Sequence, residues 1–115
     1  MAPKKPPIPS AAYDDGDGNV LVLRGSLTVG SRRDYAQTLA GAGAKPAASR
    51  EDAWHRAVEL LFERLAMRWE IAGMPIERQR ELLARFRAAD ADEREFVLRS
   101  LRAHCAEWFP ELEAP

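Results

Sequence analysis

The sequence predicts a mainly α-helical fold, in which an antiparallel three-helix unit follows a short β-strand or hairpin, a short helix and a disordered proline-rich tail. Two helix-start signals support this prediction, because Ser49 and Asp90 each precede acidic residues that can complete a capping box. A third signal is Gly73 followed by Pro75, which offers a left-handed stop and then a residue that cannot continue a helix. Short connections between the helices predict that they pack antiparallel as neighbours.

The chain is short and almost neutral. Its 115 residues allow one domain, and 17 Lys and Arg against 18 Asp and Glu leave a formal net charge of −1. Bulk charge therefore gives no argument for binding nucleic acid or an anionic membrane. The single cysteine, Cys105, excludes an intrachain disulfide and an all-cysteine zinc site and fits a reducing compartment. We therefore expect a protein without metal or cofactor.

The amino-terminal part is expected to consist of a tail and a small β segment. Residues 1–12 are rich in proline and carry two lysines, which predicts a disordered tail, and they lack the apolar stretch of a secretory signal. We therefore expect a cytoplasmic protein. Within residues 13–48, the stretch 20–29 predicts a strand or hairpin, and a capping pattern predicts a short helix over 32–40. Glycines and a proline in 41–48 predict a linker.

Residues 49–109 are predicted to form the three-helix domain, and residues 110–115 a carboxyl-terminal tail. The predicted helices cover residues 50–72, 75–89 and 91–109. On the first of them, one apolar stripe is formed by Trp54, Val58, Leu61, Leu65, Trp69 and Ala72. This stripe is expected to face the other two helices.

Other apolar residues of the long helix lie off this stripe, namely Leu60, Phe62, Met67 and Ile71. Two partner helices would cover them incompletely, so the sequence predicts an oligomer or an obligate subunit. Aromatic anchors dominate interfaces, and Trp108 and Phe109 complete the predicted contact set. We therefore predict a non-catalytic interaction or assembly adaptor that binds a protein partner or a second copy. It could serve as an accessory subunit or assembly chaperone of a larger phage-like or secretory complex.

A nucleic-acid-associated regulator is the alternative prediction. Residues 51–115 contain ten arginines and no lysine. Arginines on adjacent helices could contact phosphates, the candidates being Arg32, Arg33, Arg78, Arg80, Arg85 and Arg87. The opposing interpretation is that these arginines pair with neighbouring glutamates on solvated helix faces. A salt titration separates the two functions, because phosphate-driven binding weakens steeply with salt and apolar docking does not.

The sequence does not predict an enzyme. His104 precedes Cys105, but neighbours on a helix point about 100° apart, so this histidine is badly placed to activate this thiol. Cys105 lies on the apolar stripe of its helix and is predicted to be a buried structural residue. His55 is predicted to be a partly exposed surface residue without a metal or catalytic role.

A calcium loop is the one metal motif suggested by the sequence, and it is incomplete. Asp15, Asp17 and Asn19 alternate like the first ligands of an EF-hand loop. The position that requires glycine holds Val20, and the position that requires a bidentate glutamate holds Ser26. This segment is therefore predicted to be a simple acidic turn.

Overall fold

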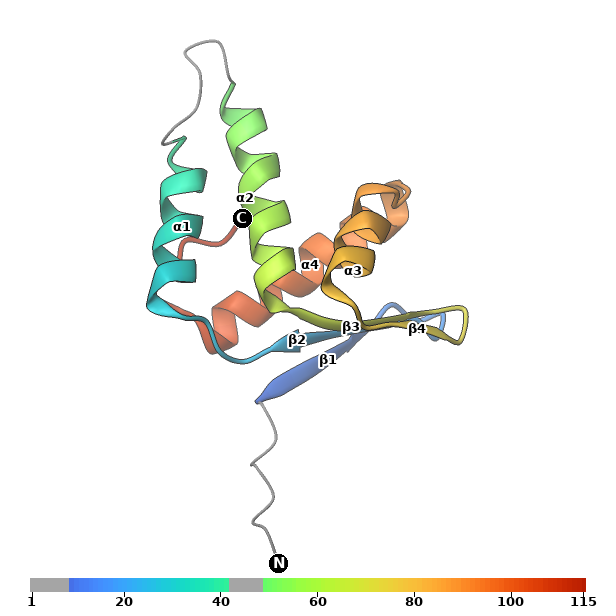
Figure 1. Ribbon diagram of the computed structural model, residues 1–115. Coiled ribbons are helices and arrows are strands. Elements are labelled where there is room, and N and C mark those ends of the chain that lie inside the picture. The colour runs from blue at the N-terminus through green and yellow to red at the C-terminus, as the bar shows by residue number, and fades with distance from the viewer. Residues whose placement is uncertain (1–8, 42–48) are drawn as a thin grey trace, which may run out of the picture.

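The computed structural model describes residues 9–41 and 49–115, and within them the chain forms an α+β fold. The strands are β1 (Ser10–Asp14), β2 (Val20–Arg24), β3 (Ala66–Ile71) and β4 (Met74–Ile76). The helices are α1 (Val29–Leu39), α2 (Arg50–Leu65), α3 (Gln79–Arg87) and α4 (Ala91–Trp108). All strands are antiparallel and lie in the order β1-β2-β3-β4 (Figure 1). Residues 1–8 of the predicted tail and 42–48 of the predicted linker lie outside the described residues. The prediction of a disordered tail is wrong for Ser10, Ala11 and Ala12, because they pair with β2 as part of β1.

The prediction of a mainly α-helical protein built on an antiparallel three-helix unit is wrong, because the long helix ends at Leu65 and not at residue 72. The next six residues form β3, which pairs with β2 on one side and β4 on the other. The error came from Trp69, whose position fits both a helical stripe and the alternating pattern of a strand. Strand pairing decides between a helix and a strand. The apolar strand β2 needs a partner on the edge that β1 does not cover, and β3 is that partner.

The Ala72–Gly73 pair is a hairpin turn between β3 and β4. The φ angles of Ala72 and Gly73 are 51° and 78°, and two positive values are typical of a type I′ hairpin. The backbone N–H of Ala72 also donates to the side-chain oxygen of Asn19 at 2.9 Å. Gly73 therefore reverses the chain within the sheet, where the sequence predicted that it would end a helix. As a result, Pro75 lies in β4 and α3 begins later, at Gln79.

The helices cover one face of the sheet (Figure 1). Strand register places Tyr13, Leu21, Trp69 and Ile76 in one row, and this row contributes to the core. Side chains alternate between the faces of a sheet, so the neighbouring row of Ala12, Val22 and Arg68 lies on the opposite face. Because β2 pairs with β3, the two halves of the chain share one sheet and one core.

Two predicted helix starts are confirmed. Ser49 with Asp52, and Asp90 with Glu93, form complete capping boxes at α2 and α4. Helix α1 begins earlier than predicted, because its N-cap is Thr28, whose hydroxyl accepts from the backbone N–H of Ser31 at 3.0 Å.

The segment after α4 packs back onto the fold. The Tyr35 hydroxyl donates to the backbone oxygen of Glu113 at 2.6 Å, and Arg102 donates to the backbone oxygen of Pro115 at 2.8 Å. Arg32 forms an ion pair with Glu111. Residues 110–115 are therefore held against α1 and α4.

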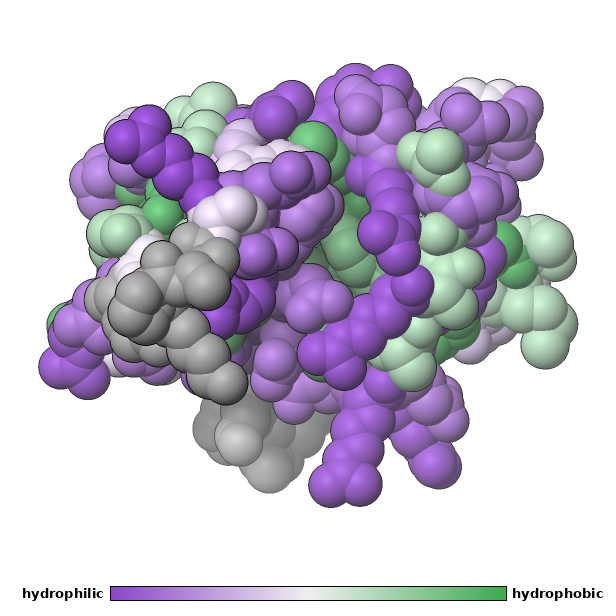
Figure 2. Space-filling view, turned by 90° about the horizontal axis from the view of Figure 1, so that it is seen from above, coloured by the Kyte–Doolittle hydropathy of each residue, from purple (hydrophilic) through white to green (hydrophobic). Residues whose placement is uncertain are grey.

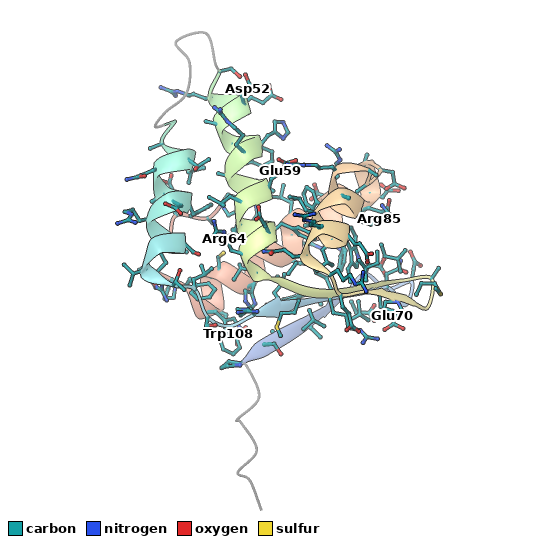
Figure 3. All side chains as sticks on the ribbon, in the orientation of Figure 1. Asp52, Glu59, Arg64, Glu70, Arg85 and Trp108 are labelled. Carbon is teal, nitrogen blue, oxygen red and sulfur yellow. The ribbon has the colours of Figure 1, made fainter. Side chains whose placement is uncertain are left out.

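Replacing Gly25 with alanine is expected to destabilise the protein by about 1–3 kcal/mol, the usual cost of overpacking. A Cβ at this position would lie 2.5 Å from Cε3 of Trp108 and 3.1 Å from Cβ of Pro9. Figure 3 shows Trp108 beside the amino-terminal end of β1. Thermal unfolding measures the effect, with Gly30→Ala as the control, because a Cβ there meets nothing closer than 3.9 Å. Equal unfolding temperatures for the two variants would contradict the close packing of Trp108 on Gly25.

Candidate functional site

A groove opens between the amino-terminal half of α2, the carboxyl end of α3 and the first turns of α4. It encloses about 230 Å³. Figure 2 looks down on this side of the molecule, where hydrophobic atoms lie in a hollow between hydrophilic ones. The apolar lining consists of Trp54, Val58, Phe86, Ala91 and Leu98.

The floor of the groove belongs to the core, and its walls are accessible. Val58 is 5% exposed and Phe86 is 7% exposed, whereas Trp54 and Leu98 are half-buried. Trp54 lies four residues before Val58, so both side chains lie on the same side of α2. The accessible aromatic wall makes this groove the strongest candidate for an apolar contact site.

The groove exists because α3 is shorter than α2. Helix α2 has 16 residues and α3 has nine. The Gln79 side chain donates to the backbone oxygen of Glu63 at 3.0 Å, which places the start of α3 beside the end of α2. The last turn of α3 reaches back only to Glu59, which pairs with Arg87. The turn of α2 that carries Trp54 therefore extends past the end of α3.

Charged side chains form the rim of the groove, namely His55, Glu59, Arg87, Arg94 and Glu95. Arg87 donates to both carboxylate oxygens of Glu59, at 3.0 Å from Nε and 3.4 Å from Nη2. This hydrogen bonding raises the pKa of Arg87 above its ordinary value. Figure 3 shows Glu59 on the side of α2 that faces α3.

Arg94 and His55 complete the rim. Arg94 donates to the backbone oxygens of Ala89 and Arg87, at 3.0 and 2.8 Å, and so caps the carboxyl end of α3. The His55 ring stands edge-on to Trp54, with a centroid distance of 5.0 Å. As the sequence predicted, His55 is an exposed surface residue. Intrachain hydrogen bonds thus hold Glu59, Arg87 and Arg94 in the rim.

The sequence-predicted partner residues are distributed over the fold. Phe62 and Phe109 are 0% and 1% exposed, so both are core residues of this chain. The four that are half-buried are Leu60, Met67, Ile71 and Trp108. Met67 lines a hollow beside Arg64, whereas Ile71 lines a different hollow beside Asp90, so these two do not share one surface.

The six candidate nucleic-acid-binding arginines lie on α1 and in or beside α3. Arg32 pairs with Glu111, Arg85 with Glu93 and Arg87 with Glu59. In the described residues no ion pair involves the remaining three, which are Arg33, Arg78 and Arg80. These lie on α1 and around the start of α3.

His104 is fully buried and joins α4 to the sheet. The Tyr13 hydroxyl lies 2.8 Å from its Nδ1, and the backbone oxygen of Arg24 lies 2.7 Å from its Nε2. Only an N–H can bond a carbonyl oxygen, so Nε2 carries the proton and Nδ1 accepts from Tyr13. Burial lowers the pKa of His104 below its ordinary value, which keeps the ring neutral. This residue is therefore a structural connection.

The prediction that Cys105 is a buried structural residue is confirmed, since it is 1% exposed. Burial raises the pKa of its thiol to about 11, so the thiol stays protonated near neutral pH. Reactive cysteines have the opposite environment, with accessible thiolates of low pKa.

The acidic turn between β1 and β2 is organised by its own hydrogen bonds. The Asp15 carboxylate accepts from the backbone N–H groups of Asp17 and Asn19, at 2.8 and 3.2 Å, and from the Asn19 amide at 2.6 Å. Across residues 9–41 and 49–115, no three His, Cys, Asp or Glu side chains are placed to hold a metal ion.

Comparison with known proteins assigns this chain to no family. A scan against protein-family models found no match, and searches of the curated proteins and of the solved structures found none. Within the part of the chain that the structure describes, no helix has both the length and the apolar character that a bilayer crossing needs.

Trp54 belongs to a stripe that was predicted to be covered by the other helices, so this groove was not predicted from the sequence. No signal within α2 itself reveals the groove, because the exposure of Trp54 depends on where α3 ends, at Arg87 beside Glu59.

Proposed function

We propose that this protein is a non-catalytic adaptor that binds an apolar segment of a partner protein in the groove beside Trp54. The observation that supports the proposal is the half-buried pair Trp54 and Leu98 standing over a floor of Val58 and Phe86. An apolar side chain seated between them would gain about 1.5–3 kcal/mol from burial. Aromatic residues at such positions commonly dominate the energy of an interface.

The size of the groove favours a protein side chain over a small molecule. Its volume of about 230 Å³ lies below the range of roughly 300–1,000 Å³ in which small-molecule sites usually fall. One or two large apolar side chains of a protein segment match this size better.

The rim favours a segment whose apolar anchor is flanked by polar groups. Glu95 and His55 stand at the groove, beside the Glu59–Arg87 ion pair. Charges at a rim contribute mainly to orientation and partner choice. A role as an accessory subunit or assembly chaperone in the cytoplasm agrees with this binding mode and with the reduced thiol of Cys105.

The test is to select peptides from a random displayed library against the whole protein and to measure their affinity by titration. Leu98→Asp and Trp54→Ala are each expected to weaken binding by about tenfold or more, a loss of about 1.4 kcal/mol. Val29→Asp is the matched control, because Val29 is 81% exposed and lies at the start of α1. It should leave the affinity unchanged.

Thermal unfolding of each variant separates loss of binding from loss of folding. Failure to select any peptide that competes for the groove would contradict the proposal. So would selected peptides that bind Leu98→Asp and Trp54→Ala as tightly as they bind the unmodified protein.

A further inference from the structure

Strand β1 forms one edge of the sheet, and no described segment pairs with its outer side (Figure 1). Two backbone hydrogen bonds show which groups face outward. Gly25 donates to the oxygen of Pro9 at 2.6 Å, and Asp15 donates to the oxygen of Asn19 at 3.2 Å. Bonded pairs alternate along an antiparallel ladder, so the odd-numbered residues of β1 bond to β2. The outward N–H and C=O groups therefore belong to Ser10, Ala12 and Asp14.

This edge lacks the features that usually prevent pairing. Exposed edges are commonly protected by proline, by bulges or by charged side chains that point inward. Strand β1 contains no proline, it pairs with β2 in unbroken register, and its one charged residue, Asp14, lies at its last position. Such an edge is a template for the addition of another strand.

We infer that the strand added here is β1 of a second copy of this chain, paired antiparallel about a two-fold axis at Ala12. In this register Ala12 faces Ala12 of the second copy, and Ser10 faces Asp14 at both ends. Ser10, Ala12 and Asp14 then all form hydrogen bonds with the second copy. The three facing pairs exchange two hydrogen bonds each, which gives six, and this count selects the register. Any other antiparallel self-pairing sets at least one of the three opposite a residue outside β1.

The side chains are complementary in this register. On the face without helices, Val22 lies behind Ala12 in the same row, so the two copies would form a continuous apolar row of small side chains. On the other face, Tyr13 would face Ala11 of the second copy, and a large side chain would lie against a small one. No two like charges face each other in this register, and such a pair would be destabilising.

Charge favours the antiparallel arrangement. The turn after β1 carries Asp15 and Asp17. Antiparallel pairing puts the acidic turn of one copy at the amino-terminal end of the other copy's β1, away from the other acidic turn. Parallel pairing would place the two acidic turns side by side, which costs energy by repulsion.

Strands of five residues form a small interface, of the class below about 1,200 Å² that gives weak complexes. We therefore expect a concentration-dependent dimer. The experiment is sedimentation velocity of the full chain at concentrations up to about 1 mM. The unmodified protein should shift from 12.9 kDa towards twice that mass as its concentration rises.

Two opposite charges at Ala12 test the register. Ala12→Asp and Ala12→Lys each place like charges directly opposite one another, so each variant should dimerise about tenfold more weakly or worse. An equimolar mixture of the two should recover the dimer, because Asp then faces Lys. Ala12 is exposed on the open face of the sheet, so these changes leave the core intact.

Met74→Asp is the control at the opposite edge, because Met74 lies in β4 and is 70% exposed. This variant should dimerise like the unmodified protein. A chain that stays at 12.9 kDa up to about 1 mM overturns the inference. Ala12 variants that dimerise normally, a mixture that fails to recover the dimer, or a dimer lost in Met74→Asp would each overturn it too. None of these results depends on the groove beside Trp54.

Discussion

Replacing Phe62 with alanine is expected to lower the free energy of unfolding by about 3–5 kcal/mol, the usual cost of deleting a buried phenylalanine. The side chain is 0% exposed and contacts two other aromatic rings of the core. Its ring centroid lies 6.0 Å from that of Trp69 and 4.7 Å from that of Phe86. Urea unfolding followed by circular dichroism measures the loss.

Leu60→Ala is the matched control for this prediction. Leu60 lies two residues earlier on α2 and is half-buried, so its loss should cost roughly half as much or less. The comparison matters because the sequence grouped Leu60 and Phe62 as partner-binding residues. If Phe62→Ala cost no more than Leu60→Ala, the assignment of Phe62 to the core would be wrong.

Acid is expected to destabilise the protein through His104. Burial lowers the pKa of this histidine in the folded state, while the unfolded chain keeps the ordinary value of 6.5. Above pH 6.5 the ring is neutral in both states. Below pH 6.5 the unfolded state takes up a proton that the folded state resists, so stability falls as the pH decreases towards the folded pKa.

The groups around the ring determine this behaviour. Tyr13 and the backbone oxygen of Arg24 bond its two nitrogens, and Glu107 on the same helix opposes the burial effect by favouring the charged form. Asp15 and Asp52 also have lowered pKa values, due to hydrogen bonds, but their contribution is lost only as the pH falls below 3.8. The two acid effects therefore occupy different pH ranges.

His104→Ala should remove the acid dependence between pH 6.5 and the folded pKa. At neutral pH it should also lower the free energy of unfolding by about 2–4 kcal/mol, since it leaves a cavity and two polar groups without partners. His55→Ala is the control, because His55 is exposed and should leave the pH dependence unchanged. Urea midpoints measured from pH 8 to pH 5 test both expectations, and a midpoint in the unmodified protein that stays constant over this range would refute them.

Local chemistry in the sequence was enough to predict several features. The starts of α2 and α4 follow from Ser49 and Asp90, because a capping box depends only on residues within one turn. The burial of Cys105 follows from its place on an apolar stripe. The strand character of residues 20–24 follows from a short β-branched and aliphatic run.

Tertiary structure decided the conformation of residues 66–71. Their spacing satisfies a helical stripe and a strand, and only the open edge of β2 selects the strand. That edge comes from a segment more than 40 residues earlier, so no local window contains the deciding partner. The same pairing reassigns Gly73 from a helix stop to a hairpin turn.

The candidate site also depends on tertiary structure. The sequence identified these apolar residues, but it placed Met67 and Ile71 in a helix where they lie in β3, and it could not tell which residues would be enclosed, since Phe62 and Phe109 proved to be core residues. The groove beside Trp54 exists because three helices of unequal length meet there. Sequence alone therefore determined where α2 and α4 begin and that Cys105 is buried. The edges and grooves depend on which segments meet in space, because hydrogen bonding and burial are satisfied between distant parts of the chain.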